Sequence, residues 1–264
     1  MPRIKDKIIW LTGASSGIGE ALAYAFNEMG NKVILSARNE DKLKEVANNC
    51  PYPERVKCLK MDLLEIDQAT EKVQKAMELF GSIDMLINNA GISQRSLIVD
   101  TKMSVYKQLI DVNYLGTVAL SKALLPHFIE QQSGHYVTVT SLMGKFGSPL
   151  RSGYCGAKHA LHGFFDVMRM EHEKDGVKVT LVCPGFVQTN IARNALTADG
   201  SAQNSQDKAT ANGLTTKVFA QRLIRAVQKN KYEAYIGKGE IRGVYLKRLF
   251  PRLLHRVVMK SQVV

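Results

Sequence analysis

The chain has 264 residues and a formal net charge of +12, and its 45% hydrophobic and 23% charged residues are ordinary for a soluble globule of one sizeable α/β domain. The apolar run 8–11 is too short for a signal peptide, and no later stretch is apolar and long enough to cross a bilayer, so we expect a cytoplasmic protein without an integral membrane anchor. The cysteines lack the spacing of metal ligands, so we expect buried thiols in a reducing compartment and no metal site at Cys50, Cys58, Cys155 and Cys183.

The first predicted strand, residues 8–11, runs directly into a glycine-rich turn and then into a helical pattern. The turn has the spacing Gly-x-x-x-Gly-x-Gly, formed by Gly13, Gly17 and Gly19. Glycine lets the backbone approach a pyrophosphate, and the helix N-terminus offers free N–H groups, so this context indicates a nucleotide site. A tight strand–helix turn without a ligand is the alternative.

The second predicted strand, residues 32–36, ends near Arg38 rather than near an acidic residue. A carboxylate here would bind a ribose 2′-hydroxyl, whereas an arginine favours a 2′-phosphate and therefore NADP over NAD. An exposed loop arginine is the alternative. A helix over about 40–49 and a strand over 56–61 follow, and Asp62 at the end of that strand could meet an adenine amino group or cap the next turn.

A helix over about 67–80, ended by Gly81, precedes a fourth predicted strand at 85–87. The run Asn88-Asn89-Ala90-Gly91 follows it. Two amides and then small residues indicate a backbone held by side-chain hydrogen bonds where a ligand passes close, although an ordinary turn has the same composition.

Residues 101–131 carry one long helical pattern that contains Asn113. An asparagine inside a helix tends to recruit backbone or water partners, so it can hold a kink or a water. Without other context, an exposed amide of no functional importance is the favoured alternative.

The alternating apolar run 136–140 predicts a buried strand that leads into Ser141, and Tyr154 and Lys158 lie four apart at the start of a later helical pattern. An ammonium near a phenol favours the phenolate and lowers a pKa that is ordinarily about 10. A serine hydroxyl can hydrogen-bond a reacting oxygen. This set suits proton transfer to or from a carbonyl or alcohol oxygen, and a tyrosine and a lysine that merely share a helix face are the alternative.

Two helices and two strands complete the pattern, at about 154–174 and 215–229 and at 177–183 and 232–237. Residues 184–189 break sharply from the sixth strand. The segment 190–213 is polar and long for a connection, so we predict a flexible substrate lid. Strands that alternate with helices predict an α/β fold, a single Rossmann-like, doubly wound parallel sheet of about seven strands flanked by helices.

From Lys238 onward the chain has seven basic residues and one acid, which carry half of the net charge. Basic residues lie opposite an apolar helical stripe, and Pro251 would kink such a helix or start it. The stripe consists of Leu246, Leu249, Phe250, Leu253, Leu254, Val257 and Val258. This tail predicts an anionic partner such as a membrane surface, and a helix docked on the globule or on a subunit partner is the alternative. Nucleic acid is not expected, because no recognised module accompanies these charges.

Together these motifs resemble the short-chain dehydrogenase/reductase family over roughly residues 5–237. The resemblance rests on Thr12-Gly13-x-x-x-Gly17-x-Gly19, Asn88-Asn89-Ala90-Gly91, Asn113, Ser141, Tyr154-x-x-x-Lys158 and Pro184-Gly185, in this order. The chain is most similar to the NADP-preferring subgroup of member seven B and hydroxysteroid-type reductases, whose usual N-terminal membrane anchor we expect to be missing here. The resemblance implies a Rossmann-fold oxidoreductase domain over 1–237, with the lid at about 190–213, and a basic amphipathic tail over 238–264.

The resemblance implies four catalytic residues, Asn113, Ser141, Tyr154 and Lys158. Tyr154 would be the general acid in reduction and the general base in oxidation. Lys158 would lower the pKa of Tyr154 and bind the nicotinamide ribose. Ser141 would hold the substrate oxygen, and Asn113 would fix a water that continues the proton path behind Lys158.

The resemblance also implies where the cofactor is held. The turn residues Gly13, Ser15, Ser16, Gly17, Ile18 and Gly19 would surround the pyrophosphate. Further contacts are implied for Arg38, Asp62, Leu63, Asn89, Ala90, Gly91, Tyr154, Lys158, Pro184, Gly185, Val187 and Thr189. Asp62 would meet adenine, Asn89 the adenosine ribose, and Val187 and Thr189 the carboxamide. Many NADP-preferring members have a basic residue where this chain has Ser16, so the prediction of NADP(H) over NAD(H) depends on Arg38.

We therefore expect an NADP(H)-dependent oxidoreductase that transfers a hydride between the cofactor and a carbonyl or secondary alcohol. An apolar pocket for a lipophilic ketone, such as a steroid, lipid or acyl ketone, is indicated by Leu142, Met143, Phe146 and Phe186. The resemblance implies a homodimer or homotetramer. A nucleotide-binding scaffold or sensor without turnover is the alternative, and the intact catalytic set speaks against it.

Overall fold

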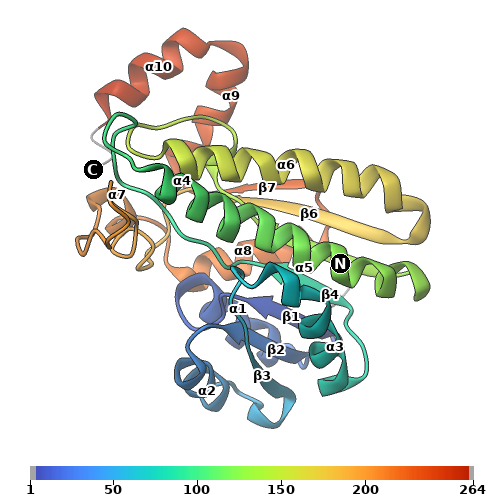
Figure 1. Ribbon diagram of the computed structural model, residues 1–264. Coiled ribbons are helices and arrows are strands. Elements are labelled where there is room, and N and C mark those ends of the chain that lie inside the picture. Colours follow the sequence, from blue (N-terminus) through green and yellow to red (C-terminus); the bar gives the residue numbers. More distant parts are fainter. Residues whose placement is uncertain (1–3, 262–264) are drawn as a thin grey trace.

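Seven parallel strands form one sheet in the computed structural model, which describes residues 4–261 (Figure 1). The strands are β1 (Ile8–Thr12), β2 (Lys32–Ala37), β3 (Val56–Lys60), β4 (Met85–Asn88), β5 (Gly134–Val139), β6 (Val177–Pro184) and β7 (Glu233–Ile236). Their order is β3-β2-β1-β4-β5-β6-β7, so the chain winds outward from β1 to one edge, returns to β4 and winds to the other edge. This confirms the predicted doubly wound sheet. Three residues at the start of the predicted domain 1–237, and three at the end of the predicted tail 238–264, lie outside the described residues.

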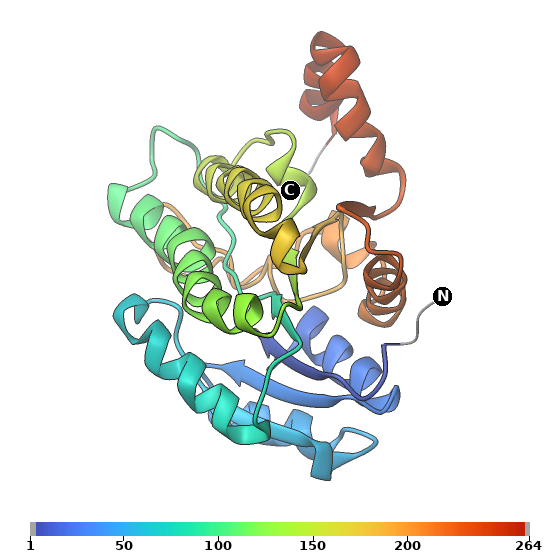
Figure 2. The same ribbon diagram turned by 90° about the vertical axis from the view of Figure 1, so that its right-hand side faces the viewer.

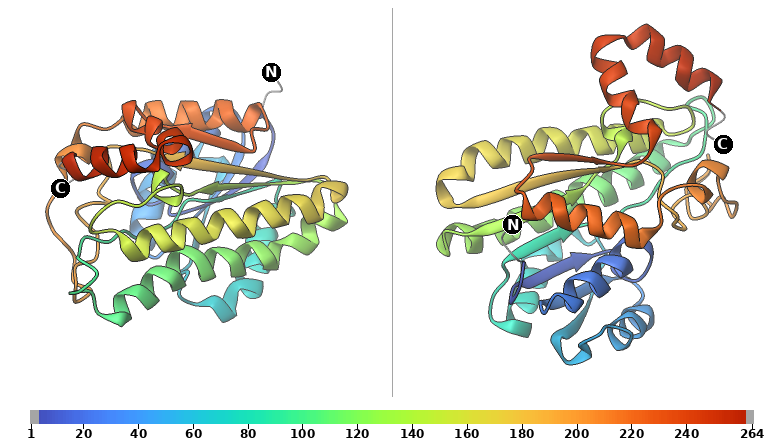
Figure 3. Two further views of the ribbon diagram at one scale, coloured as in Figure 1. Left: turned by 90° about the horizontal axis from the view of Figure 1, so that it is seen from above. Right: turned by 180° about the vertical axis from the view of Figure 1, so that it is seen from behind.

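The longer helices connect or follow these strands. They are α1 (Gly17–Glu28), α2 (Glu40–Asn48), α3 (Ala69–Phe80), α4 (Met103–Ile110), α5 (Gly116–Glu130), α6 (Ser152–His172), α7 (Lys208–Ala211), α8 (Thr216–Gln228), α9 (Arg242–Leu249) and α10 (Pro251–Lys260). Helices α5 and α6 run side by side over one face of the sheet (Figures 1 and 3). Gly81 ends α3 in the left-handed conformation, with φ 83°, as the sequence predicts.

Helices cover both faces of the sheet, and successive side chains of a strand point to opposite faces, so one strand contributes to two cores. In β1, Ile9 and Leu11 pack in a core that includes Phe26 of α1 and Phe219 of α8. Trp10, between them, packs in the opposite core, which contains residues of α3, α5 and α6. All-apolar strands of this kind are expected for a parallel sheet covered by helices on both sides, which explains why the sequence shows continuous apolar runs.

The long helical pattern predicted over 101–131 is two helices joined by one wider turn. Helix α4 ends at Ile110, the turn Asp111–Leu115 has π-helical hydrogen bonding, and α5 begins at Gly116. Asn113 lies inside this turn and is fully buried. A π turn inserts an extra residue into a helix and is often found at functional sites. The favoured interpretation of Asn113 as an exposed amide is therefore wrong.

The C-terminal segment is a helical hairpin that projects from the body of the molecule (Figures 1 and 2). Phe250 ends α9, and Pro251 occupies the first turn of α10, so this proline starts a second helix. Leu254 is 6% exposed and packs with Leu142 and Phe146 of the body. One part of the predicted apolar stripe therefore docks on the globule, while other members remain exposed.

Within residues 4–261, none of the helices has the length and apolar character that a membrane span requires.

Candidate active site

Ser141, Tyr154 and Lys158 meet at the carboxyl end of β5. Ser141 follows this strand, and its Oγ accepts a hydrogen bond from the backbone N–H of Met143 at 3.0 Å, which orders the next turn. The Nζ of Lys158 donates to the carbonyl of Val139 at 3.0 Å and lies 5.8 Å from the centroid of the Tyr154 ring. The structure thus brings together the hydroxyl, the phenol and the ammonium that the sequence places on two separate elements.

Burial controls the protonation of this set. Burial raises the pKa of Tyr154 above its ordinary value, and the hydrogen bond to Ser141 opposes this rise. Burial also lowers the pKa of Lys158 to about 8. The expected lowering of the tyrosine pKa by Lys158 is not what the structure shows, because desolvation has the larger influence on both groups. At neutral pH the phenol therefore keeps its proton and can donate it, while Lys158 remains mostly cationic.

Asn113 holds the backbone beside this set. Its Oδ1 accepts from the N–H of Ile92 at 2.9 Å, and its Nδ2 donates to the carbonyl of the same residue at 3.0 Å. A Cβ on Gly91 would lie 2.6 Å from Asn113 Oδ1 and 3.5 Å from Lys158 Nζ. Glycine is therefore required at position 91, and the amide fixes the segment after β4 next to Lys158. The role of Asn113 in holding a water stays a prediction.

Thr12 ties the glycine turn to the end of β4. Its Oγ1 accepts from the N–H of Asn89 at 3.0 Å and of Ala90 at 3.1 Å, and donates to the carbonyl of Ile87 at 3.3 Å. Asn89 Nδ2 in turn donates to the carbonyls of Thr12 and Gly13, each at 3.1 Å. The predicted tethering of this backbone by side chains is confirmed. Thr12 itself, although part of the recognised motif, was not assigned to the site, and its place directly before Gly13 is the signal that could have indicated it.

The glycine turn has the shape of an anion cradle. Gly13 has φ 65°, and a Cβ there would lie 2.8 Å from the Ala90 Cα, while a Cβ on Gly19 would lie 2.1 Å from the carbonyl oxygen of Gly13. Gly17 has φ 61°, and a Cβ there would lie 3.1 Å from the Cγ2 of Thr189. Ser16, the N-cap of α1, makes no side-chain capping hydrogen bond. The first turn of α1 is thus open to a phosphate, and these residues fit the pyrophosphate of a dinucleotide. Ser15 and Ile18 lie in the same turn.

The remaining adenosine-side residues follow β2 and β3 along the same edge. Arg38 is exposed immediately after β2. Asp62 Oδ1 accepts from the N–H of Leu64 at 3.0 Å, so the carboxylate caps the next turn, as one of the two alternatives predicts. The backbone of Leu63 packs closely on Gly116, where a Cβ would lie 2.3 Å from the Leu63 oxygen. Adenine contact by Asp62 and Leu63 stays a prediction.

The segment from Pro184 to Thr189 is held by a residue of the predicted tail. Glu240 Oε1 accepts from the N–H of Phe186 at 3.0 Å, and a Cβ on Gly185 would lie 2.1 Å from that oxygen. Val187 is buried and bridges to Leu214. Glu240 could not be assigned to the site from its sequence context, because it lies in a stretch dominated by basic residues. The boundary between domain and tail at 237 and 238 is therefore not a break in packing.

The predicted lid, residues 190–213, is docked at several points. Leu196 pairs with the segment after β4: its N–H donates to the carbonyl of Ser93 at 2.9 Å, and its carbonyl accepts from the N–H of Arg95 at 2.8 Å. Gln206 Nε2 donates to the carbonyl of Thr189 at 2.9 Å. The segment thus covers the edge of the sheet between the ends of β4 and β6.

The apolar wall expected for the substrate is partly filled. Leu142 is 2% exposed and Phe146 is 6% exposed, and both pack with Leu254 of α10. Met143 is partly buried against the same group, and Phe186 is partly exposed. Of the four predicted pocket residues, Leu142 and Phe146 therefore pack mainly against the C-terminal hairpin rather than around an open cavity.

A second polar cluster joins α6 to the strands β6 and β7. Glu233 Oε1 lies 3.3 Å from His162 Nδ1 and 3.5 Å from Cys183 Sγ, and these three residues form the one group with metal-ligating atoms in the described part of the chain. Lys145 Nζ lies 2.5 Å from the same carboxylate oxygen. This ammonium already supplies a cation to the carboxylate, so the cluster is balanced by protein groups alone.

Comparisons with known proteins agree with this geometry. A family model described as short chain dehydrogenase matches residues 7–200. The chain is 38% identical to dehydrogenase/reductase SDR family member 7B of Xenopus laevis, over 97% of this chain and 81% of the relative. It is 39% identical to member 7 of Homo sapiens, over 89% of this chain and 71% of the relative. A short-chain dehydrogenase/reductase from Burkholderia phymatum, solved in complex with NAD, has the same fold, with a TM-score of 0.84 at 22% identity over 96% of each chain.

The bridging hydroxyl of Thr12 can be tested by its removal. Thr12→Val keeps the side-chain shape but leaves the N–H groups of Asn89 and Ala90 without this acceptor. We expect it to lower the free energy of unfolding by about 1–3 kcal/mol, measured by urea denaturation. Thr12→Ser keeps the hydroxyl and should lose less than half as much. Equal losses in both variants would show that the methyl group, not the hydrogen bonds, is what matters.

Proposed function

The chain belongs to the short-chain dehydrogenase family, and we propose that it acts as an NADP(H)-dependent oxidoreductase on a lipophilic carbonyl compound or secondary alcohol. The motifs resemble those of the member 7B type, and the chain is similar over most of its length to relatives named member 7B and member 7. The observation that carries the proposal is the meeting of Ser141, Tyr154 and Lys158 at the sheet edge, beside a glycine turn that fits a pyrophosphate.

The chemistry follows from these groups. The hydroxyls of Ser141 and Tyr154 lie next to each other and both can hydrogen-bond the oxygen of a bound ketone. Tyr154 holds its proton at neutral pH and donates it to that oxygen as it becomes negative. Lys158 keeps a positive charge beside the phenol and stabilises the phenolate that remains. A bound nicotinamide supplies the hydride. In oxidation, Tyr154 takes the proton back.

The preference for NADP(H) is supported by the charge at the end of β2. Arg38 is exposed there, and Ala37 pairs in register with Lys60 of β3, which is also exposed. Glu40, the nearest acid along the chain, is paired with Lys44 at 2.9 Å. Two cations at this corner favour an additional phosphate on the ribose, whereas an acid would favour a free 2′-hydroxyl.

Association into a homodimer or homotetramer is part of the proposal. Leu115, directly before α5, and Val167 and Met170 of α6 are exposed apolar side chains, and α5 and α6 run side by side (Figure 3). Exposed apolar groups on neighbouring helices are a common basis for contact between identical subunits. The cytoplasmic location stays a prediction.

The C-terminal hairpin supports a second proposal, binding to an anionic membrane surface. Its exposed apolar side chains are Tyr245, Leu249, Phe250, Leu253, Val257 and Met259. Arg248 at the end of α9 and Arg252 and Arg256 of α10 are all exposed, and the last two lie four residues apart on one face of α10. This arrangement suits the boundary between lipid head groups and acyl chains.

A scaffold or sensor without turnover is less well supported. Such a protein would have no need for a buried lysine beside a tyrosine, and burying that charge is costly unless it serves a purpose. NADPH binding followed by turnover on a panel of ketones separates the two functions.

Tyr154→Phe tests the assignment of the proton donor. The variant removes only the phenolic oxygen, so we expect NADPH to bind with an unchanged Kd, measured by fluorescence, while ketone reduction falls at least about 100-fold, followed by NADPH absorbance. Tyr232→Phe is the control, because Tyr232 is exposed and directly precedes β7. It lies at the amino ends of the strands, whereas the site lies at their carboxyl ends. Retention of most activity in Tyr154→Phe would assign the proton donor elsewhere.

Arg38→Asp tests the cofactor preference. An acid at the end of β2 repels a 2′-phosphate and accepts hydrogen bonds from a 2′-hydroxyl. We expect the ratio of kcat/KM for NADPH to that for NADH to fall by about 100-fold, because the variant loses a charge-assisted arginine–phosphate contact. Arg38→Lys should retain the preference for NADPH. An unchanged ratio in Arg38→Asp would remove Arg38 from the cofactor site.

Vesicle flotation tests the hairpin. We expect the protein to float with vesicles that contain phosphatidylserine, and the triple variant Arg248→Gln/Arg252→Gln/Arg256→Gln to lose most of this binding, since each cation contributes about 1 kcal/mol near an anionic surface. The control replaces the exposed Lys42, Lys57 and Lys229 by Gln. Equal flotation of the two triple variants would contradict a specific role of the hairpin.

A further inference from the structure

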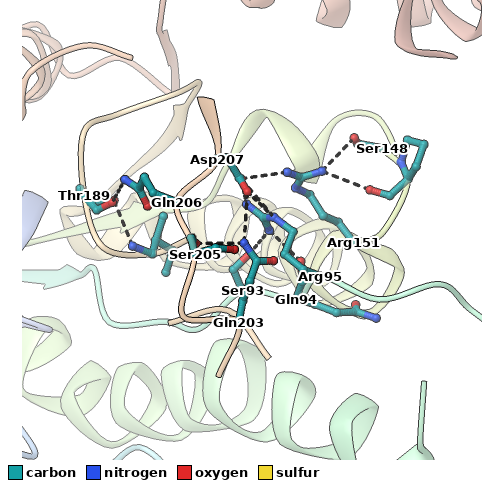
Figure 4. A network of polar contacts seen from close by, with 12 residues as sticks. Ser93, Gln94, Arg95, Ser148, Arg151, Thr189, Gln203, Ser205, Gln206 and Asp207 are labelled. Atoms are coloured by element: carbon teal, nitrogen blue, oxygen red, sulfur yellow. Dashed lines mark hydrogen bonds and ion pairs between the residues drawn. The ribbon is translucent and has the colours of Figure 1, made fainter. Parts of the chain in front are cut away.

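Three charged side chains from separate segments are buried together near the start of α6 (Figure 4). Asp207 of the predicted lid lies between the guanidinium groups of Arg95, which follows β4, and Arg151, which directly precedes α6. The side chains of Arg95, Arg151 and Asp207 are only 6%, 5% and 1% exposed. These groups lie far apart in the chain, so their meeting depends on the lid being docked.

The carboxylate of Asp207 serves both arginines. Its Oδ2 accepts from Arg95 Nη2, from Arg95 Nε at 3.1 Å and from Arg151 Nη2 at 3.2 Å. Each arginine is also fixed by backbone, Arg95 through the carbonyl of Gln94 at 2.7 Å and Arg151 through the carbonyl of Pro149 at 3.1 Å. Among the described residues, both buried cations contact the same carboxylate, and removal of a charged partner from such a group has a large effect.

This cluster is directly connected to the turn that carries Tyr154. Arg151 is the N-cap of α6, and its carbonyl accepts from the N–H of Cys155 at 2.8 Å. Gln94, the neighbour of Arg95, accepts through Oε1 from the N–H of Gly153 at 2.8 Å and of Tyr154 at 3.4 Å. Arg151 and Gln94, the neighbour of Arg95, thus both hold the first turn of α6, and Asp207 holds the two arginines.

We propose that Asp207 is a positioning residue for Tyr154, because it docks the lid on the first turn of α6 and balances the two arginines that face the phenol. This inference rests on the proposed function. It assigns to one lid carboxylate a double effect, on the placement of the proton donor and on the charge around it. A purely structural latch would have the first effect and not the second.

The charge effect has a defined sign. In the described part of the chain, the titratable and polar groups that act on Tyr154 include the Ser141 hydroxyl, the Cys155 thiol, the ammonium of Lys158 and the guanidinium groups of Arg95 and Arg151. Both arginines lower the pKa of Tyr154, because a nearby cation favours the phenolate. Asp207 opposes them. Removing its charge while both arginines remain should lower the pKa of Tyr154 and, by repulsion, that of Lys158 as well.

Asp207→Asn is the decisive variant. Ketone reduction requires the protonated phenol, so its rate falls as pH rises through the pKa of the Tyr154–Lys158 pair. We expect this alkaline limb of the kcat profile to move to lower pH by about one unit. We also expect kcat at neutral pH to fall about tenfold, because the phenol is less well placed. The Kd for NADPH, measured by fluorescence, should remain within about twofold of the wild-type value, because a tenfold change would need a lost contact.

Two further variants separate charge from packing. Asp199→Asn is the control, since Asp199 is an exposed lid carboxylate whose hydrogen bonds go to Thr197 and Ser201 of the lid itself, and its kcat profile should match the wild type. The double variant Arg95→Gln/Asp207→Asn removes one cation and one anion. Its alkaline limb should return to the wild-type position while the loss in kcat remains. It also serves as the test if the single variant does not fold.

The outcomes distinguish this inference from the proposed function. A wild-type protein that binds NADPH but reduces no ketone contradicts the proposed function, and this is measured first. Given turnover, an Asp207→Asn variant with an unmoved alkaline limb overturns the charge effect. A double variant with wild-type kcat overturns the positioning effect.

Discussion

The hydrogen bond from Lys158 to the carbonyl of Val139 is the contact on which the site depends. It joins the helix that carries Tyr154 to the strand that leads to Ser141, so one interaction sets the phenol and the hydroxyl relative to each other. The lysine pays for this position in solvation, and its pKa falls to about 8. With this pKa the ammonium still carries its charge at neutral pH.

The fold could be predicted from the sequence because its strands are buried on both faces. The inner strands β1, β2 and β4 contain continuous apolar runs, the other strands mix apolar with polar residues, and every run that we expected is a strand in the sheet. The wide turn at Asp111–Leu115 could not be predicted, because the apolar pattern of α4 continues into α5 without a change of period. A single extra residue in a helix leaves no gap in such a pattern.

Part of the site could also be predicted, namely the residues that recur at fixed spacing on one turn or one helix. The contacts that support them could not. Glu240 reaches Phe186 across 54 positions, and Asp207 reaches Arg95 across 112. Glu240 and Arg95 have no local sequence signal, because an acid in a basic tail and an arginine in a loop are ordinary surface residues until the chain is folded. The pKa of Tyr154 was misjudged for a related reason, because burial is a property of the folded state and not of the Tyr-x-x-x-Lys spacing.

The contact between Gly185 and Glu240 has a consequence for how this chain can vary. Because the carboxylate occupies the space that any larger side chain at position 185 would need, position 185 can enlarge only where Glu240 has been shortened or moved. Across an alignment of relatives, an acid in this place at 240 should therefore occur with glycine at 185. The hairpin that begins just beyond Glu240 would then be inherited together with the cofactor loop rather than exchanged as an independent module.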